Sequence, residues 1–100
     1  MELLELSKKV KEKFGDKVDR IILFGSHARG DYGNDSDVYL LLIVNDEGIE
    51  YELRKFIYSF IPQLNRLISV KVISTKDYKR LKEMKLSFIR SVEKEGVVIG

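Results

Sequence analysis

The chain has 100 residues, with 18 basic and 16 acidic side chains, a formal net charge of +2 at pH 7 and no cysteine. Its 44% hydrophobic and 34% charged residues are typical of one small globular domain spanning residues 1–100, alone or as a small homo-oligomer. The near-neutral charge gives no strong general attraction to nucleic acid or to a membrane, so neither is an expected partner. The lack of cysteine and of a signal-peptide pattern favours a cytoplasmic location.

The first half of the chain alternates helical and strand patterns. Apolar residues at three- and four-residue steps predict a helix from Leu3 to Phe14 that ends near Gly15. Residues 18–24 form a β-branched and apolar run, which predicts a buried strand that stops at Gly25. Residues 25–36 are rich in glycine and predict a loop or one helical turn. The apolar run at 37–44 predicts a second, central strand and is far too short to cross a membrane.

The second half predicts the elements that cover the sheet. A helical stripe runs from Leu53 to Leu64, and Pro62 ends or kinks that helix near Ile61 because it lacks an amide donor. Residues 68–73 predict a third strand, and the spacing of Ser74 and Asp77 resembles a capping box that begins a long third helix, ending before Gly96. Residues 97–99 predict a short last strand. This order predicts an α/β (α+β) domain with a mixed sheet of about four strands and helices packed mainly on one face.

One motif carries chemistry: Gly25-Ser26-His27-Ala28-Arg29-Gly30, followed after a polar loop by Ser36-Asp37-Val38-Tyr39. Gly25 allows a sharp turn, and Ser26 offers a hydroxyl and an amide at the start of a helical turn, where anions bind. Arg29 can contact phosphate or can anchor the loop through an ion pair. The simpler alternative for Ser26 is an N-cap with no ligand.

This arrangement resembles the minimal nucleotidyltransferase domains of the DNA polymerase beta superfamily, which read Gly-Ser-x-Ala-Arg-Gly, a loop and Ser-Asp-x-Asp. The resemblance covers nearly the whole chain and implies the nucleotidyltransferase fold, with Gly25, Ser26 and Arg29 holding ATP or another nucleoside triphosphate. It also implies that Asp37 is a catalytic residue and a ligand of Mg²⁺. It further implies an antitoxin of a HEPN/MNT pair, because active relatives transfer AMP from ATP to a tyrosine of a HEPN-domain toxin protein.

Two positions depart from the family pattern. Tyr39 replaces the second aspartate, and a neutral phenol is a poor magnesium ligand at pH 7. Lys71, within Val70-Lys71-Val72, replaces the third carboxylate. An ammonium there repels divalent ions, so we expect an ion pair between Asp37 and Lys71 and weak metal affinity.

Three functions therefore stay open from the sequence. The chain is an antitoxin that nominally transfers AMP to its partner, with reduced or absent turnover. Alternatively, it is a catalytically inactive module of the same fold that binds nucleotide, a partner protein or both. The third alternative is an oligomeric scaffold whose cleft is vestigial.

Overall fold

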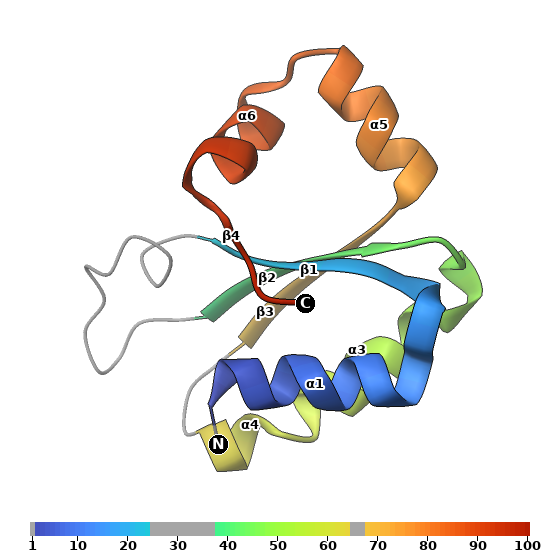
Figure 1. The fold of residues 1–100 in the computed structure, drawn as a ribbon, viewed down its shortest axis with the longest axis vertical. Helices are drawn as coiled ribbons and strands as arrows, with labels where there is room; N and C mark the ends of the chain where they lie inside the picture. The colour runs from blue at the N-terminus through green and yellow to red at the C-terminus, as the bar shows by residue number, and fades with distance from the viewer. Residues whose placement is uncertain (1, 25–37, 65–67) are drawn as a thin grey trace.

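A four-stranded mixed sheet forms the centre of the computed structural model, which describes residues 2–24, 38–64 and 68–100 (Figure 1). The strand order is β3-β2-β1-β4. Strand β2 (Val38–Val44) pairs antiparallel with β1 (Val18–Phe24) and parallel with β3 (Ile68–Ser74), and the short β4 (Val97–Val98) pairs antiparallel with β1. The predicted mixed sheet and the central place of its second strand are confirmed.

Helices cover both faces of the sheet (Figure 1). The sequence predicted helices mainly on one face, and the structure corrects this. None of the helices within the described ranges is long and apolar enough to cross a membrane. The first face carries α1 (Leu3–Phe14), α3 (Glu50–Tyr58) and α4 (Ile61–Leu64), and the second carries α5 (Thr75–Glu83) and α6 (Ser87–Glu95); short 3₁₀ turns η1 (Gly15–Lys17) and η2 (Glu47–Ile49) complete the order.

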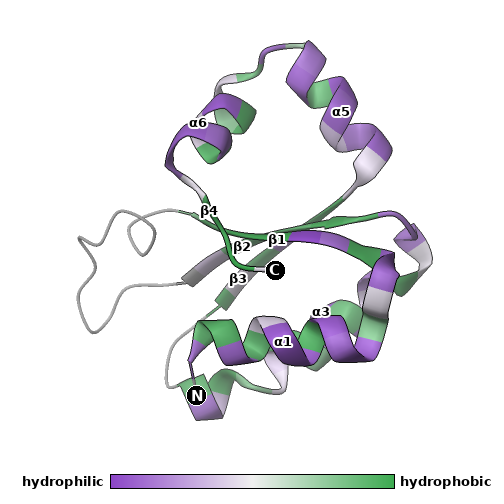
Figure 2. Cartoon of the chain, in the orientation of Figure 1, coloured by the Kyte–Doolittle hydropathy of each residue, from purple (hydrophilic) through white to green (hydrophobic). Residues whose placement is uncertain are grey.

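Strand β2 belongs to two hydrophobic layers at once. Successive strand side chains point to opposite faces, so Leu40 and Leu42 pack with α1 and α3, whereas Leu41 and Ile43 pack with α5 and α6. All four are at most 2% exposed. Figure 2 shows hydrophobic colouring along the central strands and mostly polar colouring over α5. We refer below to the α1–α3 layer and the α5–α6 layer.

The predicted helix boundaries agree with the structure where strong local signals exist. Helix α1 ends at Phe14 because Gly15 adopts a positive φ of 58°, which glycine takes without steric cost. Helix α5 begins after Ser74, whose hydroxyl accepts a 3.0 Å hydrogen bond from the amide of Asp77. The predicted cap at Ser74 is confirmed.

Two helix predictions are wrong in detail. The helix expected to run to Ile61 ends at Tyr58, and Pro62 lies in the separate short helix α4. The long third helix is in fact two helices, α5 and α6, separated by residues 84–86. Lys85 turns the chain there with a φ of 56°.

Candidate functional site

The carboxyl end of β1 and the amino end of β2 lie side by side at one end of the sheet, and we call this place the corner. Phe24 and Tyr39 are paired in the β1–β2 register, and their ring centroids lie 5.8 Å apart. Phe24 and Val38, the described residues on either side of positions 25–37, both lie at this corner. The predicted site residues Gly25, Ser26, Arg29 and Asp37 lie outside the described residues, as does the expected ion pair between Asp37 and Lys71.

Lys71 lies on the same face of the sheet as Tyr39. In the parallel β2–β3 register, Tyr39 pairs with Ser69 and Leu41 pairs with Lys71. Because side chains alternate along a strand, Tyr39 and Lys71 both point toward the α5–α6 layer. Lys71 lies on the neighbouring strand, two residues beyond the partner of Tyr39. The structure therefore brings together the two residues that depart from the family pattern.

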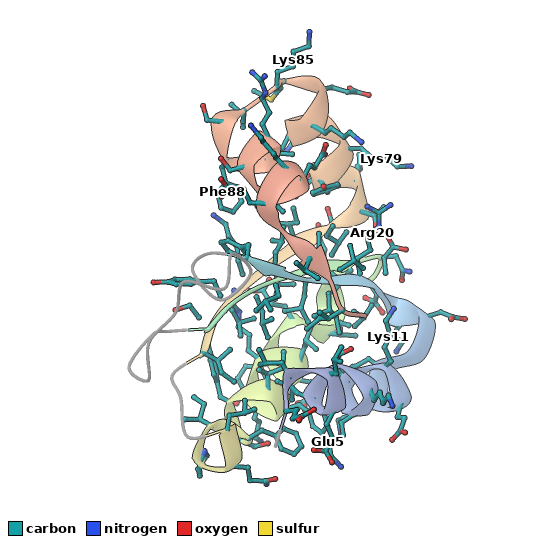
Figure 3. The ribbon with its side chains drawn as sticks, turned by 60° about the vertical axis from the view of Figure 1, so that its left-hand side comes forward. Glu5, Lys11, Arg20, Lys79, Lys85 and Phe88 are labelled. Atoms are coloured by element: carbon teal, nitrogen blue, oxygen red, sulfur yellow. The ribbon has the colours of Figure 1, made fainter. Side chains whose placement is uncertain are left out.

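Phe88, in the first turn of α6, completes this corner. The Lys71 Nζ lies 4.4 Å from the centroid of the Phe88 ring, within the range of a cation–π contact. The Phe88 ring meets the Phe24 ring edge-on, with centroids 5.8 Å apart and planes at 88°. We call Phe24, Tyr39, Lys71 and Phe88 the aromatic–cation cluster; Figure 3 labels Phe88 at the side of α6.

The chemistry of this cluster favours an anion over a metal ion. Lys71 is exposed, and Tyr39 and Phe88 are each 38% exposed, so an ammonium with N–H donors faces solvent beside aromatic rings. Among the described residues, no group of three or more histidine, cysteine, aspartate or glutamate side chains could hold a metal ion. The residues at these two positions, a phenol and an ammonium, do not fit Mg²⁺, which prefers carboxylate and water oxygens.

A hollow lies away from this corner, between α1 and α3. It has a volume of about 310 Å³ and is lined by Lys13, Glu52, Lys55, Phe56 and Ser59. The Lys13 Nζ lies 5.2 Å from the centroid of the Phe56 ring, which in turn packs edge-on against Phe14. This hollow is open, and Phe56 in its wall packs in the α1–α3 layer, so the position of that ring is explained by packing.

Sequence reasoning missed Phe24 and Phe88 as residues of the corner. Phe88 falls within the segment that the sequence predicted to be one long helix. Only the turn at Lys85, which separates α5 from α6, brings Phe88 against Lys71 and Phe24. The one available signal was the position of Phe24, directly before the glycine of the motif.

Comparison with known sequences finds relatives along the full chain. The sequence model described as a nucleotidyltransferase domain matches residues 3–99. A Methanocaldococcus jannaschii protein named "Putative protein adenylyltransferase MJ0141" is 40% identical over 106 residues, covering 99% of this chain and 100% of that protein. Another from the same organism, "Putative protein adenylyltransferase MJ0604", is 32% identical over 93 residues, covering 90% of this chain and 86% of that protein.

Comparison with solved structures finds the same fold in toxin–antitoxin complexes. A crystal structure of a toxin–antitoxin with AMP-PNP contains a chain with a TM-score of 0.64 at 16% identity, covering 99% of this chain and 73% of that one. A chain in the crystal structure of a mutant of the toxin–antitoxin MntA-HpeT has a TM-score of 0.62 at 16% identity, covering 97% of this chain and 72% of that one. At such identities the likeness shows a shared fold.

Proposed function

This chain belongs to the nucleotidyltransferase domain family, and from that premise we propose that it is an antitoxin that binds a HEPN-domain toxin protein and a nucleoside triphosphate. Transfer of AMP from ATP to the partner is slow or absent in this proposal. Neutralisation of the toxin then rests on binding, and the nucleotide acts as a ligand more than as a substrate.

One observation carries the proposed loss of turnover: the Lys71 ammonium lies on the Phe88 ring, on the same sheet face as Tyr39. By family resemblance, these two positions hold carboxylates that bind magnesium in active relatives. A cation and a neutral phenol cannot replace those ligands, because a divalent ion is repelled by the first and weakly held by the second. We therefore assign no reaction step to a metal in this chain.

The relatives support the partner and the ligand. Two similar chains of known structure belong to toxin–antitoxin complexes, one of which contains AMP-PNP, and the similarity covers nearly all of this chain. In the proposal, Gly25, Ser26 and Arg29 hold the triphosphate, since a glycine-serine turn offers amides and Arg29 offers a guanidinium. Asp37 is then the one carboxylate retained from the family's metal site.

Co-expression with a HEPN-domain toxin protein tests the proposal. We expect the two proteins to co-purify and the toxin's ribonuclease activity to fall. Incubation of the purified pair with labelled ATP and Mg²⁺ should leave the toxin essentially unlabelled. The double variant Tyr39→Asp/Lys71→Asp is the comparison, because it restores carboxylates at both positions and is expected to gain label transfer.

Two results would count against this function. Failure of the unmodified chain to bind or neutralise the toxin would remove the antitoxin role. Near-complete labelling of the toxin by the unmodified chain would show that catalysis persists in spite of Tyr39 and Lys71.

The second candidate function is active AMP transfer to a protein. It is favoured by the 40% identity to the M. jannaschii protein named as an adenylyltransferase. Under this alternative, label transfer by the unmodified chain is efficient and Asp37→Ala abolishes it. The labelling experiment therefore separates the two candidates directly.

A further inference from the structure

We propose that Lys71 is a built-in cation that neutralises a bound phosphate chain, so that the aromatic–cation cluster binds a nucleoside triphosphate without a divalent metal ion. This inference rests on the proposed function, because the ligand is the same nucleotide. It goes further by giving Lys71 a function of its own. The Lys71 ammonium supplies the positive charge that a magnesium ion would otherwise bring to the phosphates, and it also repels that ion.

Among the described residues, no carboxylate forms an ion pair with the Lys71 ammonium. Some other cations do lie beside carboxylates, as in Arg54 with Glu50 at 3.1 Å and Arg80 with Asp77 at 3.0 Å. The contact recorded for Lys71 within the described part of the chain is with an aromatic ring. A ring carries a quadrupole and no net charge, so this contact orients the ammonium without cancelling its positive charge.

The fold also fixes where this charge lies. Val70 and Val72 pack into the α1–α3 layer, so strand alternation sends the Lys71 side chain to the opposite face. There the Phe88 ring, itself braced edge-on by Phe24, lies beside the ammonium. The ammonium is therefore held at the corner where β1 ends, and its exposure leaves it accessible to a ligand.

An ammonium suits the oxygens of a phosphate chain. It has three N–H donors, and charge-assisted hydrogen bonds from lysine to phosphate are short and strong. The same charge repels a divalent cation from this place. Binding should consequently not be strengthened by Mg²⁺, which competes with the ammonium for the phosphate oxygens, and it should weaken as salt is added.

Calorimetric titration with ATP tests this with the unmodified chain first. We expect ATP to bind at least as tightly in excess EDTA as in excess Mg²⁺. Lys71→Gln should weaken binding about tenfold, the loss expected for one charge-assisted contact. Lys71→Arg, which keeps the charge, should stay within about threefold of the unmodified chain.

Lys79→Gln is the matched control, because it removes the same charge from an exposed position on α5. Figure 3 shows Lys79 and Phe88 on opposite sides of the view, and this change should leave the ATP affinity unaltered. Far-UV circular dichroism checks that each variant is folded. The magnesium comparison needs no variant, so it holds even if Lys71→Gln fails to fold.

The outcomes distinguish a failure of the role proposed for Lys71 from a failure of the proposed function. ATP binding that strengthens more than tenfold with Mg²⁺, or that is unchanged by Lys71→Gln in the folded protein, overturns the role of Lys71 and leaves the proposed function standing. No ATP binding under any condition overturns the inference and the nucleotide-binding part of the proposed function together. Metal-independent binding lost in Lys71→Gln supports both.

Discussion

Tyr78 shows how the α5–α6 layer accommodates a polar group. Its ring is buried against Ile89 and Val92, and its hydroxyl donates a 3.1 Å hydrogen bond to Oε1 of Glu93. The same carboxylate oxygen lies 3.6 Å from the Lys82 Nζ. Burial, followed by the hydrogen bond and negative charge of Glu93, raises the pKa of Tyr78 above its ordinary value of 10.0.

This shift predicts a loss of stability in alkali. The folded state favours the neutral phenol, so its contribution is complete below the unfolded pKa near 10.0 and is lost as pH rises through the higher folded pKa. Above pH 10, the free energy of unfolding should fall more steeply for the unmodified chain than for Tyr78→Phe. At pH 7 the same variant should lose about 0.5–1.5 kcal/mol, the usual net worth of a hydrogen bond.

Urea unfolding across the alkaline range measures this difference. Tyr51→Phe is the control, because Tyr51 is 72% exposed and its hydroxyl can be removed without opening the layer. Parallel pH profiles for the unmodified chain and Tyr78→Phe would refute the assigned role of Tyr78.

The residues of the candidate site were only partly predictable. The family resemblance implied that Tyr39 and Lys71 belong to one site, and the structure places both on the same face of the sheet. The contact between Lys71 and Phe88 was not predictable, because it joins an edge strand to a helix through a turn that no sequence pattern marks. The motif residues at 25–37 remain predictions.

At the scale of elements, the break between α5 and α6 explains this failure. Leu81 and Phe88 are seven residues apart, close to two helical turns, so the apolar stripe keeps its phase across the break. Residues 84–86 contain neither glycine nor proline, the usual signals for the end of a helix. Periodicity alone therefore predicted one long helix.

Lys85→Gly should stabilise the chain. Lys85 has a φ of 56°, which costs a residue with a Cβ about 1–2 kcal/mol, whereas glycine takes it freely. Part of this gain is offset by the greater freedom of glycine in the unfolded state, so we expect a net increase of about 0.5–1 kcal/mol in the free energy of unfolding. Thermal and urea unfolding measure it.

The matched change in the opposite direction is Gly15→Ala. Gly15 ends α1 with a φ of 58° and has nothing within 4 Å of an added Cβ, so any loss there comes from backbone conformation alone. We expect a loss of about 1–2 kcal/mol. A loss of stability in Lys85→Gly would show that the lysine side chain contributes more than its backbone costs.

Over the whole molecule, the sheet separates the α1–α3 layer from the α5–α6 layer. The uninterrupted apolar run of β2 is typical of a strand that is covered on both faces, and its central position was predicted correctly. The face of the sheet that each helix covers was not predicted correctly. An amphipathic stripe shows that a helix packs on the sheet without showing on which side. The side on which α5 and α6 pack is set by how the chain crosses over the sheet after β3, and the hydrophobic pattern alone does not specify this crossing.

Because β2 serves both layers, they should unfold together. Leu53→Ala opens the α1–α3 layer and Ile89→Ala opens the α5–α6 layer, at side chains that are 0% and 1% exposed. Each should cost about 2–5 kcal/mol, with unfolding still in one step, whereas Leu4→Ala, at a side chain 57% exposed, should cost far less. Urea unfolding followed by far-UV circular dichroism and by tyrosine fluorescence should give coincident transitions for every variant. Separate midpoints in Ile89→Ala would mean that α5 and α6 can leave the sheet while β2 stays folded, and the corner built on Lys71 and Phe88 would then open before the rest of the domain.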